Sequence, residues 1–432
     1  MRQLLWLVLL VAGTACGVAL ALSPRPLSAQ GLSVTDEGVS NNFPDGMEFR
    51  VSAASDDAIE EVRLRYTVLP DGTTASGVPD FQTGSSVSTV FTLSGNEPPR
   101  IYLPPGTRID YHWEVEDAAG NTATTPEQSI VYEDVRFDWT TLEADGVIIH
   151  YYSGSEDDAQ AMLDVAQVAI AQMSGLLAAT VEFPVNVRIY ASTDDMRPAL
   201  ERRSEAYESQ IITAGVRVSS DTVLVLGNVS FSTLRHELAH VITGIAGEGP
   251  FGDLPAWLDE GTAVYAQGDP EGFGGALERA IDRGNVLSVR SITSYQGDPD
   301  KVDLFYGQSW SLVSFLVDTY GEEKFARLFA EIKGGKTTDA ALEAVYGFDQ
   351  DGLDNEWRSS VGLPPREDTA QDGEEAVPTT FPPSDGGSGD APAAAEDGGG
   401  TSAGVIIGLA LAILAVAAAI ALATVVLARR LR

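Results

Sequence analysis

Residues 236–240 read HELAH, and this pattern decides how the surrounding chain is expected to fold. On a helix, residues four apart share a face, so His236 and His240 point the same way and can hold one Zn²⁺ ion. Glu237 then lies beside the metal as a general base. Glu260 offers the third ligand of a zinc hydrolase and leaves one coordination position open for water. The sequence therefore predicts a hydrolytic site with one zinc ion per chain.

Two observations make this pattern more specific than a short match alone. The chain has four histidines, and two of them fall in the pattern. The context is also helical: we expect one helix that Ser232 caps and Gly244 ends, and a second from about residue 256 to 266 that carries Glu260. Two other interpretations stay open, a surface helix with two unrelated histidines and an enzyme fold that has lost its activity.

Around these residues the chain resembles the gluzincin metallopeptidases, and more closely the bacterial peptidase MA-like domains. The matching strings are LRHELAH at residues 234–240 and PAWLDEGTA at residues 255–263, and the likeness covers roughly residues 137–362. The resemblance implies a zincin-like fold in which both histidines and the glutamate of the second string bind zinc. It also implies that the glutamate between the histidines activates water.

A looser match reads YGQSW at residues 306–310. Through it, the resemblance implies that Tyr306 stabilises the oxyanion of the reaction, although Tyr306 is equally compatible with an aromatic at the start of a core helix. Related zinc aminopeptidases carry a Gly-x-Met-Glu-Asn string that grips the free amino terminus of the substrate. Residues 213–217 read TAGVR in the comparable place. This departure favours endopeptidase action.

Composition limits the classes of partner. The chain has 432 residues, enough for two or more domains, and a net charge of −36 from 63 acidic and 27 basic residues. Nucleic-acid binding needs a basic footprint, so we expect no nucleic-acid partner. A peptide or protein is the expected substrate, and the sequence gives no indication of the oligomeric state.

The two ends of the chain predict export and a membrane anchor. Residues 1–30 read as a signal peptide with cleavage near Ala29, although the long apolar run also allows an uncleaved anchor. Residues 403–428 read as a transmembrane helix, because they are apolar and uncharged over a length that spans a bilayer. The arginines of residues 429–432 predict a cytoplasmic tail. We therefore expect a single-pass protein of the cell membrane with its catalytic domain outside the cell.

Three further segments lie between these ends. Residues 31–135 alternate apolar and polar side chains in short runs between turn signals, which predicts an all-β sandwich of the immunoglobulin or fibronectin type. Residues 136–363 are expected to form an α+β zincin-like metallopeptidase domain with a helical lobe. Residues 364–402 are rich in Pro, Gly, Ser and acidic residues, which predicts a disordered acidic linker.

Within the predicted catalytic domain, local patterns place the elements around the site. Strands are expected at residues 146–152, 185–190 and 221–226, and helices at 157–179, 309–320 and 322–332. In related enzymes the last strand before the metal helix lies at the sheet edge. We therefore expect residues 223–226 to pair with the substrate backbone, or else to form a plain buried strand.

These patterns combine into one predicted function, a membrane-anchored extracellular zinc-dependent endopeptidase. The remaining alternative is a cell-surface binding or adhesion protein that keeps an inactive zincin-like scaffold, because the β module, linker and anchor suit it equally well. Asp259 is a candidate partner for a zinc-binding histidine by adjacency alone. Helix geometry is expected to turn it away from the face of Glu260.

Overall fold

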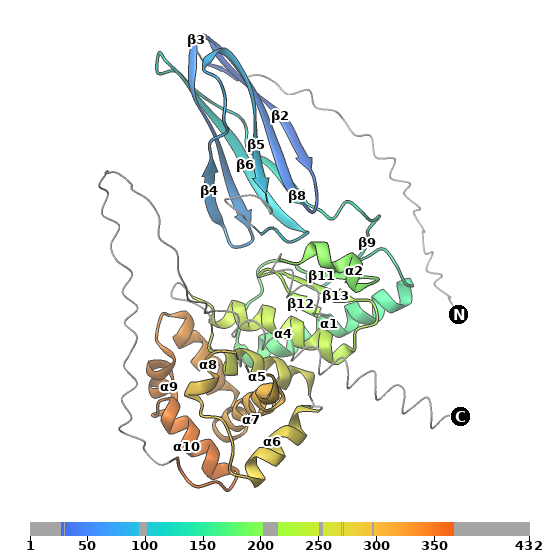
Figure 1. Cartoon of the computed structure of the whole chain (residues 1–432), viewed down its shortest axis with the longest axis vertical. Helices are drawn as coiled ribbons and strands as arrows, with labels where there is room; N and C mark the ends of the chain where they lie inside the picture. The colour runs from blue at the N-terminus through green and yellow to red at the C-terminus, as the bar shows by residue number, and fades with distance from the viewer. Residues whose placement is uncertain are drawn as a thin grey trace, which may run out of the picture. The chain divides into compact units, whose positions relative to one another are not determined.

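The computed structural model describes residues 27–29, 31–94, 102–201, 215–249, 254–268, 270, 272–295 and 298–366. They divide into two compact units (Figure 1). Unit 1 comprises the chain up to Ile101 together with Ile109–Ile130, and unit 2 comprises Tyr102–Arg108 and the chain from Val131 onward. The division therefore falls a few residues before the predicted boundary at residue 135, and a short excursion of the chain joins unit 2 early.

The segments predicted at the chain ends lie almost wholly outside the described residues. This holds for residues 1–26 of the signal peptide, for the transmembrane segment 403–428 and tail 429–432, and for the linker beyond Arg366. Leu27–Ala29 form strand β1, which pairs with β2 (Leu32–Asn41). Cleavage near Ala29 would therefore remove a strand from unit 1. In the part of the chain that the structure describes, no helix combines the length and apolarity needed to cross a bilayer.

Unit 1 is an all-β structure, as predicted. After β1 its strands are β2 (Leu32–Asn41), β3 (Gly46–Leu69), β4 (Thr73–Gly77), β5 (Gly84–Ser94), β6 (Thr107–Asp117), β7 (Thr122–Thr124) and β8 (Gln128–Tyr132). The long β3 pairs with β2 and β5 along its first half and with β4 along its second. Alternate residues of β3 are buried, so its period-two pattern buries one face. The immunoglobulin-like arrangement of the strands stays a prediction.

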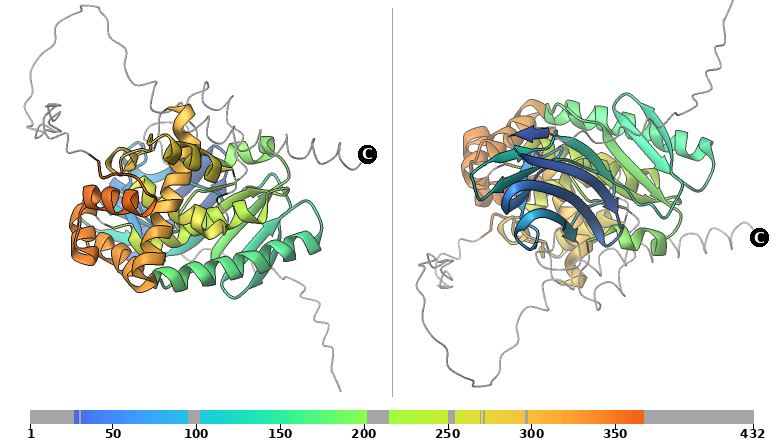
Figure 2. Two further views of the ribbon diagram at one scale, coloured as in Figure 1. Left: turned by 90° about the horizontal axis from the view of Figure 1, so that it is seen from below. Right: turned by 90° about the horizontal axis from the view of Figure 1, so that it is seen from above.

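Unit 2 contains a five-stranded sheet with the order β12-β13-β11-β10-β9. The strands are β9 (Thr140–Ala144), β10 (Val147–Tyr151), β11 (Val185–Tyr190), β12 (Gly215–Arg217) and β13 (Thr222–Leu226). The three central strands are parallel, and β9 and β12 run antiparallel to their neighbours. Figure 2 shows helices packed beside this sheet.

Of the two interpretations of residues 223–226, the plain buried strand is confirmed and the edge strand is wrong. β13 is buried along its whole length and pairs with β11 on one side and β12 on the other. Next to β13, at one edge of the described sheet, lies β12, which the sequence did not indicate because three residues that begin with a glycine give no periodic signal. β9 was also missed, although Asp145-Gly146 between β9 and β10 is a typical two-residue hairpin turn with both φ angles positive.

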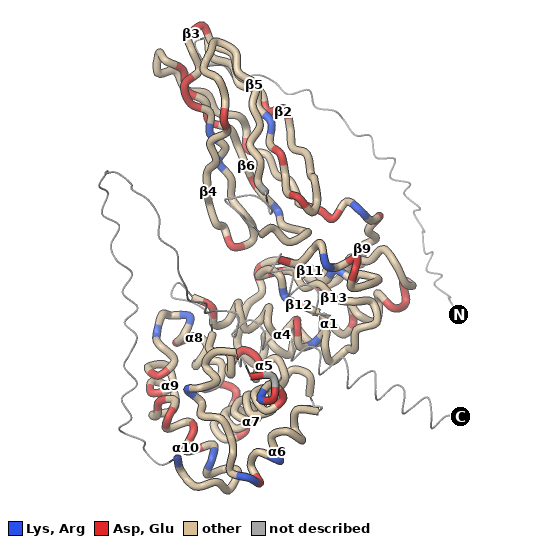
Figure 3. Tube along the Cα trace, in the orientation of Figure 1, with Lys and Arg blue, Asp and Glu red and all other residues tan. Residues whose placement is uncertain are grey.

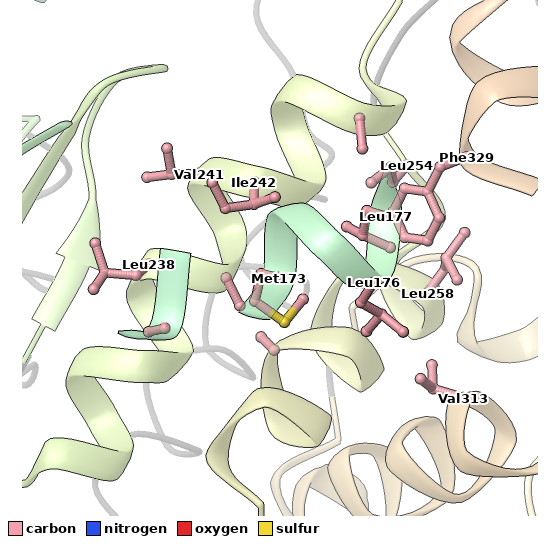
Figure 4. Packing of buried hydrophobic residues seen from close by; sticks show 14 of the residues in the cluster. Met173, Leu176, Leu177, Leu238, Val241, Ile242, Leu254, Leu258, Val313 and Phe329 are labelled. Atoms are coloured by element: carbon pink, nitrogen blue, oxygen red, sulfur yellow. The ribbon is translucent and has the colours of Figure 1, made fainter. Parts of the chain in front are cut away.

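The main helices of unit 2 are α1 (Glu156–Leu177), α4 (Phe231–Gly247) and α5 (Ala256–Gln267). Apolar side chains of α1, α4 and α5 meet those of α7 (Val302–Tyr320) and α8 (Glu322–Lys333) in one core (Figure 4). α4 differs from its predicted limits, because Ser230 caps it through the N–H of Thr233, and the helix continues beyond Gly244. Gly244 does not end the helix, since it lies where the side chain of Arg217 packs closely.

The predicted helical lobe is confirmed. It consists of α6 (Phe273–Asp282), α7 (Val302–Tyr320), α8 (Glu322–Lys333), α9 (Thr338–Tyr346) and α10 (Gln350–Ser360). The described part of unit 2 also contains the short α2 (Thr193–Met196) and the 3₁₀ turns η1 (Arg197–Ala199), η2 (Arg290–Ile292) and η3 (Pro299–Lys301). Arg366 donates hydrogen bonds to Asp354 and Asn355 of α10, so the first residues of the predicted linker still pack on the lobe.

Acidic residues are scattered along loops and helices of both units rather than gathered in one segment (Figure 3). This distribution matches the excess of 63 acidic over 27 basic residues in the whole chain. Like charges spread over a surface repel other copies of the same molecule and favour solubility.

Helices α5 and α7 approach unusually closely at Gly261. A Cβ at this position would overlap the main-chain oxygen of Ser309 and lie 2.9 Å from a methyl carbon of Val313. Backbone atoms within a packed helix cannot move aside at low cost. Glycine therefore sets the distance between the helix that carries Glu260 and the helix that carries Tyr306.

We predict that Gly261→Ala lowers the free energy of unfolding of unit 2 by about 1–3 kcal/mol, because the added methyl group overpacks the α5–α7 contact. Gly175→Ala is the matched control, since a Cβ there meets nothing within 4 Å and alanine favours helix by about 1 kcal/mol. Urea unfolding followed by circular dichroism measures both. Equal stability of the two variants would contradict the close contact.

Candidate metal centre

The structure brings His236, His240 and Glu260 together from two different helices. α4 presents both histidines on one face, and α5 packs across α4 and presents Glu260. One ligand atom from each residue lies within 4.8 Å of the others. The Glu260 side chain is 7% exposed, and the histidine side chains are 13% and 12% exposed. The cluster is therefore largely buried, and Glu260 is its least exposed member.

The spacing of the three ligand atoms fits a tetrahedral zinc ion. The two Nε2 atoms of His236 and His240 are 3.2 Å apart, and they lie 3.3 and 3.5 Å from Oε2 of Glu260. Ligands at about 2.0–2.2 Å around a tetrahedral centre are about 3.3–3.6 Å from one another. Among the described residues, no well-aligned hydrogen-bond donor reaches this buried Oε2. A cation between the three atoms would satisfy it.

Electrostatics at the cluster favour an ionised Glu260. Burial alone would raise the pKa of this carboxyl, but the charges of His240 and His236 outweigh burial and hold the pKa well below its usual range. An ionised carboxylate and two imidazoles form the donor set that zinc prefers in hydrolases.

Asp259 contacts the second nitrogen of His240, contrary to the expectation that helix geometry turns it away. Its Oδ2 lies 3.0 Å from Nδ1 of His240, and its Oδ1 accepts a 2.5 Å hydrogen bond from Thr243. The reason is that α5 lies along the imidazole ring, so adjacent residues reach opposite nitrogens of one ring. A carboxylate on Nδ1 keeps the proton there and directs Nε2 toward the metal position.

Gln267 lies beside Nδ1 of His236 as Asp259 lies beside Nδ1 of His240, and the sequence analysis did not identify it. Its amide nitrogen lies 3.1 Å from Nδ1 of His236, and its buried oxygen has no hydrogen-bond partner in the described part of the chain. With the amide turned over, the oxygen would accept the Nδ1 proton of a metal-bound histidine. The available signal was spacing, since Gln267 follows Glu260 by two helical turns on α5.

Glu237 lies between the histidines and strand β12. Burial raises the pKa of this carboxyl, and the charges of His236 and His240 and a hydrogen bond from the main-chain N–H of Arg217 act in the opposite direction. A Cβ on Gly215 would lie 2.8 Å from Cγ of Glu237, so β12 packs directly on this side chain. A carboxyl with a raised pKa accepts and returns a proton more readily near neutral pH.

Tyr306 points into the same cluster from α7. Its ring lies 6.5 Å from the His236 ring and stacks on Phe273 at 5.0 Å. Burial and the charges of Glu260 and Glu237 raise its pKa well above the usual value. The hydroxyl therefore stays protonated and can donate a hydrogen bond. This placement agrees with the predicted position of Tyr306 beside the site, and its role in catalysis stays a prediction.

Tyr295 supplies a second phenol that the sequence did not indicate. The charge of Glu260, then burial, raise its pKa, and its hydroxyl is hydrogen-bonded to the Glu260 carboxylate. Tyr295 follows a 3₁₀ turn in an irregular segment, so no periodic pattern marks it. Tyr295 is therefore a further polar group close to the Glu260 carboxylate.

Residues 165–362 match the family model described as the Peptidase MA superfamily. With the two histidines and Glu260 assembled as described, unit 2 contains a gluzincin-like domain of the Peptidase MA superfamily. The match covers less than half of the 432 residues and includes no part of β1–β8. No curated protein matches the chain.

Several solved structures are similar at a distance. The M1 zinc metallopeptidase from Deinococcus radiodurans is 14% identical, with 74% of this chain and 91% of that chain covered and a TM-score of 0.33. Aminopeptidase A from Legionella pneumophila in complex with aspartic acid is 10% identical, with 72% and 47% covered and a TM-score of 0.36. Similarities this low do not define an activity.

We predict that Gln267→Leu weakens zinc binding by about 10–100-fold, because the Nδ1 proton of His236 loses its acceptor. Gln267→Glu is the matched variant and should keep or strengthen binding, since it retains the acceptor. Competition with a chromophoric chelator measures the affinity without reference to activity. Equal affinity of wild type and Gln267→Leu would show that Gln267 merely fills space.

Proposed function

We propose that this protein is a zinc-dependent endopeptidase that hydrolyses peptide bonds through an activated water molecule. The observation that carries the proposal is the spacing of 3.2–3.5 Å among the ligand atoms of His236, His240 and Glu260 beside the half-buried Glu237. This combination supplies a metal position and a base within one cluster. One zinc ion per chain is the proposed cofactor.

The chain's own residues account for the proton transfers. Zinc, when bound, supplies the Lewis acidity that polarises the scissile carbonyl and acidifies water. Glu237 takes the proton from the attacking water and then delivers it to the leaving amine. The Tyr306 hydroxyl donates a hydrogen bond to the negative charge that develops on the carbonyl oxygen. Asp259 and Gln267 hold the histidine rings in the orientation that this requires.

The edge strand β12 is the proposed docking position for the substrate backbone. β12 ends the described sheet beside Glu237, and an extended peptide can add to such an edge through main-chain hydrogen bonds. The residues of β12 are Gly215, Val216 and Arg217, and none of these three is acidic. An aminopeptidase needs a carboxylate to hold the free amine of its substrate, so this composition supports cleavage within a peptide.

We further propose that the enzyme acts outside the cell and is held at the membrane by residues 403–428. This rests on the uncharged length of that segment and on the arginines that follow it. A peptide or protein outside the cell is then the substrate.

We predict that the purified full-length chain binds about one zinc ion and that Glu260→Ala loses it, because two histidines alone hold zinc weakly. Glu237→Gln should keep the zinc while turnover falls by at least about 100-fold, because the base is lost. Elemental analysis and a peptide cleavage assay on the three proteins measure both properties. A folded wild type without zinc would favour the cell-surface binding alternative.

We predict that N-acetylated fluorogenic peptides are cleaved internally at least as fast as the same peptides with free amines. The reason is that nothing on β12 holds a free amine. Mass spectrometry of the products, with amino-acid nitroanilides as the exopeptidase control, decides the cleavage position. Stepwise release of single amino-terminal residues would instead identify an aminopeptidase.

A further inference from the structure

The side chain of Arg217 connects the edge strand β12 to the metal helix α4. Its NH1 group donates to the main-chain oxygen of His240 at 2.9 Å. The same guanidinium forms a two-pronged ion pair with Glu248, at 2.7 Å to Oε1 and 2.9 Å to Oε2. Its Nε donates to the main-chain oxygen of Ser219 at 3.1 Å. One side chain therefore joins the segment 217–219 to two positions on α4, His240 and the C-cap Glu248.

α4 is shaped to receive this guanidinium. Gly244 lies on the facing side of the helix, and a Cβ there would be 2.6–2.9 Å from the guanidinium atoms of Arg217. Glu248 is the C-cap residue of α4, and its own N–H bonds to the oxygen of Gly244. A cation at a helix C-terminus is favourable, and a planar guanidinium fits a carboxylate in two-pronged form. Any side chain at residue 244 would displace Arg217.

The main chain of the same residue reaches the base. The N–H of Arg217 donates a hydrogen bond to the Glu237 carboxylate, and Gly215 at the other end of β12 packs against the Glu237 side chain. β12 has three residues and pairs only with β13 in the described sheet. Backbone pairing alone therefore fixes the position of this strand weakly. The contacts of the Arg217 side chain with α4 contribute more to holding β12 in place.

We propose that Arg217 is a positioning residue that holds β12, and through it the Glu237 carboxylate, in register with the metal helix. The inference rests on the proposed peptidase function and adds a residue to it. The guanidinium is attached to the carbonyl of His240 and the amide to the carboxylate of Glu237. Arg217 therefore contacts both the proposed base, Glu237, and the main chain of His240, and so fixes their relative positions.

The attachment of Arg217 would also set the position of a substrate that pairs with β12. A peptide that pairs with β12 receives its position relative to the base from the same Arg217 attachment. A misplacement of about 1 Å at a reacting group can cost about 100-fold in rate. Loss of the attachment should therefore act on kcat, while the zinc site stays intact because its ligands lie on α4 and α5.

The test compares Arg217→Met, Arg217→Lys and Gly244→Ala with wild type in the full-length chain. Arg217→Met removes the guanidinium, and Gly244→Ala keeps it but occupies its place. Arg327→Met is the control, because it removes an exposed arginine that pairs with Glu331 on α8. The measurements are zinc content, amide hydrogen exchange of the segment 215–219, and kcat and KM on an N-acetylated fluorogenic peptide.

We expect Arg217→Met and Gly244→Ala to keep one zinc per chain, to exchange the amides of 215–219 faster, and to lose about 100-fold in kcat. Arg217→Lys should recover part of both losses, because an ammonium replaces one prong of the ion pair. Arg327→Met should match wild type.

Wild-type exchange and kcat in both Arg217→Met and Gly244→Ala would overturn the proposal. So would faster exchange across all of α4 with loss of zinc, since that result identifies Arg217 as a helix cap alone. If wild type cleaves no peptide, the exchange data still decide whether Arg217 holds β12, and the peptidase function fails separately. If Arg217→Met does not fold, Arg217→Lys and Gly244→Ala carry the same comparison.

Discussion

The rest of unit 2 depends on one electrostatic constraint, the burial of the Glu260 carboxylate against two imidazoles. A carboxylate that is 7% exposed is costly unless opposite charge or donors surround it. Its Oε2 has the Nε2 atoms of His236 and His240 at 3.3 and 3.5 Å, a spacing that a cation between the three atoms would fit. The packing of α4 on α5 places these groups together, Asp259 contacts the His240 ring from its other nitrogen, and Tyr295 lies close to Glu260.

The parts of the site with a periodic signature were predictable from the sequence. Four-residue spacing on one helix placed His236 and His240 together, and apolar periodicity placed the helices that present them. The all-β character of unit 1 followed from alternation, and the lobe from helical patterns. These signals work because the residues concerned belong to the same element and share one face of it.

The parts that depend on contacts between elements were not predictable. Asp259 reaches His240 only because of how α5 crosses α4; adjacency to Glu260 made it a candidate, but the geometry of α5 alone suggested the opposite direction. Gly244 resembles a helix terminator in sequence, yet it serves a close approach to Arg217 within a helix that continues. β12 is too short to give a pattern in the sequence, so the sequence points to the neighbouring β13 as the edge of the sheet. In each case the deciding partner lies on another segment.

The glycine contact between α5 and α7 has a mechanical consequence for the site. Because Gly261 leaves no room against Ser309, the two helices cannot slide or rotate independently, and Glu260 and Tyr306 move as one rigid body. Both histidines belong to α4, which packs on α5 over a shared core. Strand β12, on the other side of Glu237, has three residues and is held separately, by its pairing with β13 and by the ion pair of Arg217 with Glu248. Helix packing thus sets the distance between Glu260 and Tyr306, while a separate attachment sets the position of β12.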